Sequence, residues 1–145
     1  MTGQPPTQTS RAGSSQRSPL AALLLAPVLG AGLALTSVPY DWSVLTPLPL
    51  AALLGWASLP GSPLQVAARL FWSMTPFFSL HLLFLPLSFA PLFGLVGALL
   101  FPALFLLEGG FYALLGLAVA RLLPTFLGRV WGLAFGWVIL EWLRH

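Results

Sequence analysis

The sequence predicts an all-α fold: a polytopic integral membrane helix bundle with about five transmembrane helices. The composition supports this, because 58% of the residues are hydrophobic and 6% are charged, whereas about a quarter of an ordinary globular domain is charged. The stretch from Leu70 to Ala120 holds fifty-one residues and one charged side chain, Glu108. Since about 20 apolar residues of α-helix cross the ~30 Å hydrocarbon core, this stretch predicts two crossings.

Composition and motifs exclude several classes of function. The 145-residue chain has no cysteine, which excludes disulfides, thiolate metal sites and cysteine nucleophiles. Its six basic residues are all arginine and are scattered singly, whereas nucleic-acid-binding proteins gather basic residues on one face. The sequence contains no metal-ligand cluster, phosphate loop or nucleotide motif. We therefore expect no metal, no cofactor and no nucleic-acid partner.

Residues 1–19 are predicted to form a disordered cytoplasmic tail, because their polar, Gly and Pro side chains bury too little apolar surface to offset ordering entropy. The membrane domain is predicted to occupy residues 20–145. Its first span, 20–38, is longer than a usual signal-peptide core, so we expect it to be retained; a cleaved signal peptide is the alternative. Small residues at every fourth position, which are also common in membrane helices generally, predict a close-packing face: Ala22, Ala26, Gly30 and Ala34.

A turn and a shorter apolar segment follow the first span. The run from Pro39 to Trp42, which includes Tyr40 and Asp41, combines turn-forming and aromatic side chains. It therefore predicts a polar turn at the membrane surface. The second span is predicted at 44–59, and the Pro-Gly-Ser-Pro run after it is predicted to end it.

The third and fourth spans are predicted at 70–89 and 92–122. We place the break between them at Ser88 to Pro91, because proline disfavours helix in the residue before it and has no N–H to donate. The fourth span would be ~46 Å long as a helix. We therefore expect it to tilt, kink or project beyond the lipid.

The fifth span is predicted at 125–143. Its most apolar part, Val130 to Leu143, would reach only ~21 Å, short of the ~30 Å core. Either the span begins near Pro124, with Arg129 extending toward the membrane surface, or the chain stops inside a segment that should continue. Three glycines at every fourth position predict a second packing face: Gly128, Gly132 and Gly136.

The arginines predict the orientation of the chain, because the cytoplasmic flanks of membrane spans collect positive charge. With five spans and an inner tail, five arginines fall on the cytoplasmic side: Arg11, Arg17, Arg69, Arg121 and Arg129. Arg144 alone falls outside. We therefore expect a bacterial cytoplasmic (inner) membrane protein with its N-terminus in the cytoplasm and its C-terminus outside. A four-span arrangement, with Arg121 and Arg129 in an exit tail, is the alternative.

The candidate intramembrane polar residues are His81 and Glu108, which lie well inside the predicted third and fourth spans. A carboxylate near the centre of a span costs roughly 2.5–3.5 kcal/mol on insertion scales, so Glu108 should face protein or water. It is either a ligand or proton site or a carboxyl hydrogen-bonded within the bundle. Counted from the expected turn, the two residues differ in depth by ~13 Å, so we do not expect them to pair. Glu141 and Arg144 are expected to form a local ion pair.

Three segments resemble the apolipoprotein N-acyltransferase family. Thr36 to Asp41 (TSVPYD) is similar to that family's first outer turn, and Pro63 to Ala68 (PLQVAA) is similar to its second inner loop. Trp137 to Arg144 (WVILEWLR) resembles its fifth-span signature, in which an aromatic residue is followed, after three variable positions, by Glu, an aromatic residue, Leu and Arg. The order and spacing of the segments also match, so the resemblance covers residues 20–145.

The resemblance implies an eight-span membrane domain and an outward-facing nitrilase-like domain. Such enzymes move an acyl chain from a phospholipid to an enzyme cysteine, aided by Glu and Lys, and then to the N-terminal diacylglyceryl-cysteine of a lipoprotein. This chain has neither cysteine nor lysine, so no catalytic residue is placed in it. The resemblance suggests six residues that face substrate or lipid: Tyr40, Asp41, Trp137, Glu141, Trp142 and Arg144.

We therefore expect the N-terminal membrane portion of such an acyltransferase, inactive by itself. Its partners would be membrane phospholipid, a separate chain that carries the nitrilase-like domain and, only through that domain, the lipoprotein substrate. The alternative is a small self-contained membrane scaffold or transporter subunit that assembles through the two small-residue faces. A decayed remnant without function is a third interpretation.

Overall fold

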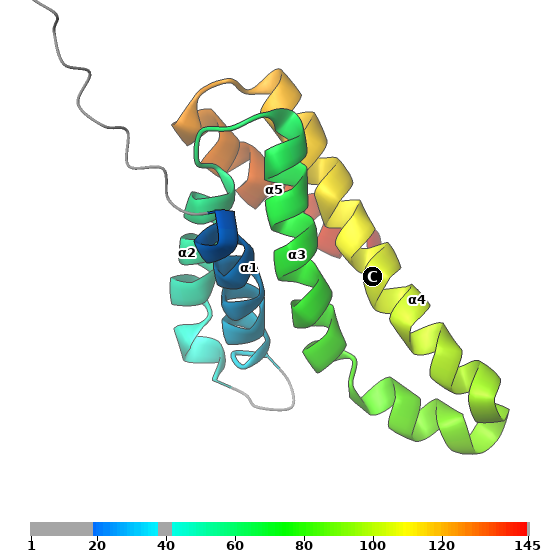
Figure 1. Cartoon of the computed structure of the whole chain (residues 1–145). Helices are drawn as coiled ribbons and strands as arrows, with labels where there is room; N and C mark the ends of the chain where they lie inside the picture. The colour runs from blue at the N-terminus through cyan, green and yellow to red at the C-terminus, as the bar shows by residue number, and fades with distance from the viewer. Residues whose placement is uncertain (1–18, 38–41, 145) are drawn as a thin grey trace, which may run out of the picture.

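The structure, a computed structural model, describes residues 19–37 and 42–144 (Figure 1). Every regular element in this part of the chain is a helix, which confirms the all-α class: α1 (Pro19–Ala34), the short 3-10 helix η1 (Ser43–Leu45), α2 (Pro47–Ala57), α3 (Pro63–His81), α4 (Phe84–Leu122) and α5 (Phe126–Arg144). The predicted tail, up to Ser18, lies outside the described residues.

The third helix, α3, lies at the centre of the arrangement and packs against α1 on one side and α4 on the other (Figure 1). Successive helices run in opposite directions, so the α2–α3 and α4–α5 turns lie at one end of the bundle. We call it the arginine end. The side chains of Arg69 and Arg129 bind its turns, and Arg121 lies in the last turn of α4.

Local sequence signals explain where α3 begins. The Ser62 side chain accepts a hydrogen bond from the backbone N–H of Gln65, and the Gln65 side chain accepts one from the N–H of Ser62. This capping box, followed by Pro63, starts a helix. One face of α3 is then buried through Val66, Leu70, Ser73, Met74, Phe77 and Phe78. The first helix approaches this face at Gly30, where an added Cβ would overlap the backbone carbonyl oxygen of Ser73.

Two helices among the described residues are long and apolar enough to cross a membrane: Leu99–Leu122 within α4, and Phe126–Arg144. A third crossing is counted if Pro63–His81 and Phe84–Gly97, bent by 66°, form one span. The helices α1 and α2 are apolar but shorter. Large apolar side chains cover the outer surface, with Val44 at 91% exposure, and extended apolar surfaces of this kind mark contact with lipid or protein.

The break between the third and fourth spans differs from the prediction. The sequence predicts it at Ser88 to Pro91, but the chain is helical there; α3 ends at its C-cap Leu82, and a second break lies at Gly94. Pro86 lies in the first turn of α4, where a missing N–H removes no helical hydrogen bond, so a helix can start just before it. Gly94 has φ of 57°, a left-handed conformation that residues with a Cβ rarely adopt.

Candidate functional site

Four polar side chains join α4 to α5 within the apolar bundle. Glu108 and Tyr112 belong to α4, and Glu141 and Arg144 belong to α5. The Tyr112 hydroxyl donates a hydrogen bond to Oε1 of Glu141 over 2.7 Å. Arg144 donates from Nη1 to Oε2 of Glu108 over 3.4 Å, and its Nη2 forms the predicted ion pair with Glu141. We call these four residues the polar cluster.

Helix spacing and close packing explain how the cluster assembles. Its two residues on α4 are four positions apart and its two on α5 are three apart, so each pair lies on one face of its helix. Glycines let these faces approach. A Cβ added at Gly132 would lie 3.0 Å from Cγ1 of Val119, and one added at Gly136 would overlap the side chain of Leu115. These two glycines of the predicted packing face therefore set the register between α5 and α4.

Aromatic rings pack against Tyr112 and Arg144 of the polar cluster. The guanidinium carbon of Arg144 lies 5.2 Å from the centre of the Phe78 ring, a cation–π geometry. The ring of Tyr112 lies 5.7 Å from that of Phe78 and 4.7 Å from that of Trp137, and Tyr112 is only 2% exposed. These rings bury Tyr112 and lower the polarity around its hydroxyl, which strengthens its hydrogen bond to Glu141, whereas the ion pairs of Arg144 lie at the exposed edge of the cluster.

A hollow of about 250 Å³ opens beside the cluster, lined by Glu108, Phe111, Tyr112, Leu140, Leu143 and Arg144. The polar cluster beside it holds two carboxylates, those of Glu108 and Glu141, and one guanidinium, that of Arg144. Among the described residues, no group of three or more His, Cys, Asp or Glu side chains could hold a metal ion. The arrangement can fix two helices in register and orient a polar group at the hollow, but the cluster presents no activated nucleophile.

His81 takes no part in the polar cluster. Its Nδ1 lies 3.1 Å from Oγ of Ser37, and its ring stacks on Phe77 with 5.5 Å between ring centres. In the part of the chain that the structure describes, no hydrogen bond or ion pair joins His81 to Glu108. The histidine therefore ties α3 to the end of α1, whereas the glutamate ties α4 to α5.

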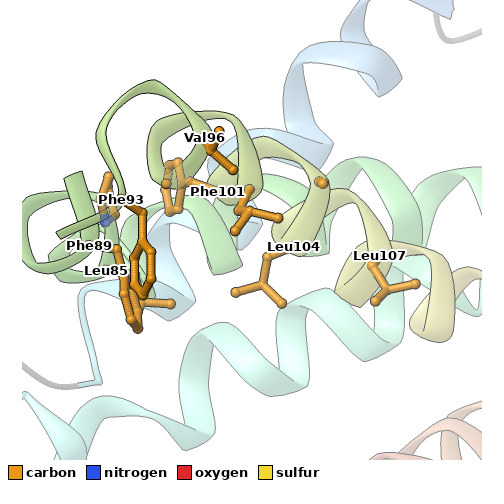
Figure 2. Close-up of a pocket in the computed structure, with 11 residues that line it drawn as sticks. Leu85, Phe89, Phe93, Val96, Phe101, Leu104 and Leu107 are labelled. Atoms are coloured by element: carbon orange, nitrogen blue, oxygen red, sulfur yellow. The ribbon is translucent and has the colours of Figure 1, made fainter.

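A second, apolar hollow of about 470 Å³ lies between the two parts of α4 that meet at Gly94. Figure 2 shows the side chains that line it: Leu85, Phe89 and Phe93 come from the part before Gly94, and Val96, Phe101, Leu104 and Leu107 come from the part after it. No charged residue lines this hollow. Its chemistry therefore suits a hydrocarbon chain rather than a polar ligand.

The remaining substrate- or lipid-facing candidates do not all lie at the polar cluster. Tyr40 and Asp41 lie outside the described residues. Trp137 packs against Tyr112 beside the polar cluster, whereas Trp142 is 76% exposed.

The residues of the two predicted small-residue faces also differ in whether they pack against another helix. On α1, Ala26 and Ala34 are buried and Gly30 lies against α3, but the side chain of Ala22 is outside the described set. On α5, Gly128 does not reach α4 directly: a Cβ there would meet the hydroxyl of Thr125, in the preceding turn, at 2.7 Å. Gly132 and Gly136 therefore make the close contacts between α5 and α4.

Tyr112 and Phe78 are not among the site residues that the sequence predicts. A signal for Tyr112 exists, because it follows Glu108 by four residues and so shares its helix face. Phe78 carries no such signal, since its contact with Arg144 depends on how α3 and α5 are placed in space.

No protein-family model, characterised protein or solved structure matches this chain. The geometry of the polar cluster, two members of which belong to the run at 137–144, therefore carries the functional interpretation.

Proposed function

We propose that this chain forms the membrane platform of an apolipoprotein N-acyltransferase. In this role it positions a phospholipid donor and a lipoprotein acceptor, while a nitrilase-like domain on other polypeptide transfers the acyl chain to the N-terminal diacylglyceryl-cysteine. One observation carries the proposal. Glu141 and Arg144, the charged residues of the WVILEWLR run, both bind partners on α4, namely Tyr112 and Glu108.

These contacts give the run a physical reason to contain its two charges. A glutamate or an arginine within a membrane helix is costly, and it is usually found paired and facing the helix bundle. Here α4 supplies a partner for each charge, so the run fixes the register of the fourth and fifth helices. A platform that must hold substrates in place needs such a fixed register.

The proposed topology has five crossings, with the arginine end in the cytoplasm and the C-terminal end of α5 outside the bacterial inner membrane. The 16-residue α1 would extend ~24 Å. The apolar segment Ser43–Ala57 would extend ~22 Å. Both are short for a ~30 Å core, so the proposal requires local thinning of the bilayer or a contribution from flanking residues. The three arginines at one end of the bundle support the orientation.

The apolar hollow at Gly94 supports a role for phospholipid. It is bounded by the aliphatic and aromatic side chains of Leu85, Phe89, Leu104 and their neighbours, and it is only partly enclosed by protein. We assign it to an acyl chain of the donor, which would complete the enclosure and bury its own surface.

The chemistry is assigned to polypeptide outside these 145 residues. A thioester route needs a cysteine thiolate as the nucleophile, and the chain contains neither cysteine nor lysine. Its contribution would therefore be binding and orientation of the two lipid substrates, which can supply a large part of an enzymatic rate enhancement.

An acyl-transfer assay with a fusion protein tests the proposal. The chain would replace the first five spans of an active apolipoprotein N-acyltransferase, and the mass of a diacylated lipopeptide would be followed in phospholipid vesicles. We expect N-acylation by the fusion and none by the chain alone. Within the fusion, Arg144→Gln should lower the rate, whereas Arg121→Gln, at an exposed position, should not.

Two outcomes would overturn this proposal. Acyl transfer by the isolated chain would place the chemistry inside these residues. A fusion that inserts and folds but remains inactive would favour a self-contained membrane scaffold or transporter subunit.

A further inference from the structure

The arginine end carries guanidinium groups without a carboxylate partner among the described residues. Both described acidic side chains belong to the polar cluster, where they bind Arg144. Arg69 instead donates to the backbone carbonyl oxygens of Ala57, Leu59 and Pro60 over 3.4, 2.7 and 3.3 Å. These carbonyls lie at the C-terminal end of α2, so Arg69 serves as a cap for that helix.

Arg129 is more buried than Arg69, and fewer of its N–H groups donate to described residues. It is 9% exposed and donates from Nε to the carbonyl oxygen of Leu123, just after α4, over 3.1 Å. Its two Nη atoms donate to no described residue. In the described part of the chain, Ser58 Oγ is the only fully buried side-chain nitrogen or oxygen without a partner. The Nη edge of Arg129 therefore has no partner among the described residues and is not fully buried.

The surroundings of this edge are positively charged. The turns that Arg69 and Arg129 cap lie at the same end of the bundle, and α2 contacts α5. The N-terminal ends of α3 and α5 lie at this end beside the C-terminal ends of α2 and α4, so the partial charges of the helix ends largely offset and the guanidinium groups supply the positive charge. No described acidic side chain at this end offsets these charges.

We propose that Arg129, with Arg69 at the same end of the bundle, binds the phosphate of an anionic phospholipid headgroup at the membrane surface. A planar guanidinium edge matches two phosphate oxygens. The N–H groups that precede Gly128 in α5 add further donors, whereas that of Gly128 already donates to the Thr125 hydroxyl. A lipid is the favoured source, because helices on both sides of the site are apolar enough to lie in a bilayer. Free phosphate presents the same chemistry. The site requires only membrane insertion and does not rest on the acyl-transfer proposal.

The test is the thermal unfolding of the purified full chain in neutral detergent, with phosphatidylglycerol, phosphatidylcholine or inorganic phosphate added in turn. Phosphatidylglycerol should raise the midpoint most, because phosphatidylcholine brings a cation to a positive site. Arg129→Gln should lose most of this rise. Since charge-assisted hydrogen bonds are the strong ones, its affinity for phosphatidylglycerol should fall about tenfold. Arg121→Gln removes the same charge from an exposed position at the same end and should keep the rise.

Each outcome decides the proposal. Equal rises in the wild type, Arg129→Gln and Arg121→Gln would overturn it in favour of diffuse attraction to anionic lipid. An equal rise with inorganic phosphate, lost in Arg129→Gln, would support the phosphate site and assign it to free phosphate. If Arg129→Gln does not fold, Arg129→Lys decides: it keeps the charge but lacks the two-nitrogen edge, so it should bind phosphatidylglycerol about tenfold more weakly. Unchanged affinity in Arg129→Lys would count against the site.

Discussion

Tyr112 of α4 donates a 2.7 Å hydrogen bond to Glu141 of α5, although the two residues are 29 positions apart in the sequence. Arg144 adds a second link between the same helices through Glu108. Both links lie in an aromatic environment that includes Phe78. The antiparallel pair α4–α5 is therefore fixed by polar contacts as well as by apolar packing.

Tyr112→Phe should lower the free energy of unfolding by about 1.5 kcal/mol, because a hydrogen bond to a charged group is lost at a buried position. Reversible unfolding in mixed micelles would measure it. A double-mutant cycle provides the control: in a Glu141→Ala background, the same Tyr112→Phe change should cost much less. Equal costs in both backgrounds would show that the hydrogen bond contributes nothing.

Arg144→Gln should lower the free energy of unfolding by about 1 kcal/mol, the upper range for partly exposed ion pairs, because it leaves Glu108 and Glu141 as neighbouring like charges. Adding Glu108→Gln should recover part of this loss, since removing both partners of an ion pair costs less than removing one. The same micelle unfolding measurement applies. A double variant less stable than Arg144→Gln would contradict the pairing.

Gly30→Ala should destabilise the bundle by roughly 1–3 kcal/mol, because its Cβ would overlap the backbone carbonyl of Ser73, which α3 holds in place. Gly32→Ala is the matched control. No atom lies within 4 Å of a Cβ at Gly32, so alanine there should be neutral or stabilising by up to ~1 kcal/mol through helix propensity. Similar thermal midpoints for the two variants would show that α1 does not pack on α3 at this glycine.

Gly94→Ala should cost roughly 1–2 kcal/mol, because a residue with a Cβ is strained at φ of 57°. Gly110→Ala, on the same helix and with no atom within 4 Å of the added Cβ, should instead stabilise it. Thermal unfolding of the two variants would compare them. A stabilising Gly94→Ala would mean that α4 continues straight through this position.

Helices are the part of this structure that the sequence predicts best. Long apolar stretches with polar turns predict an all-α chain, and the boundary between the fourth and fifth helices, near Pro124, is found close to its predicted place. The break after α3 is misplaced, because Pro91 is read as a helix end while Pro86 and Gly94 hold the stronger local signals. A proline in a first turn and a glycine at positive φ can be recognised only once the helix start is known.

Contacts between helices are the part that the sequence does not predict. Arg144 and Glu108 are 36 residues apart, and whether they meet depends on a register set by the packing of Gly132 and Gly136 on α4. Spacing along one helix does predict the pairing of Glu141 with Arg144. Contacts within one helix can be predicted from residue spacing, whereas the distance between two helices depends on every residue packed between them.

The proposed topology has five membrane crossings, with the arginine end facing the cytoplasm. Thiol labelling tests it directly, because the chain contains no cysteine and any introduced thiol is unique. Pro60→Cys and Pro124→Cys, exposed at the arginine end, should react with a membrane-impermeant maleimide only after the membrane is opened. Ser43→Cys, exposed at the other end, and a cysteine added after His145 should react on intact spheroplasts. Labelling of Ser43→Cys and Pro60→Cys from the same side of the membrane would contradict the five-crossing topology. Labelling of the added C-terminal cysteine only from inside would contradict it as well.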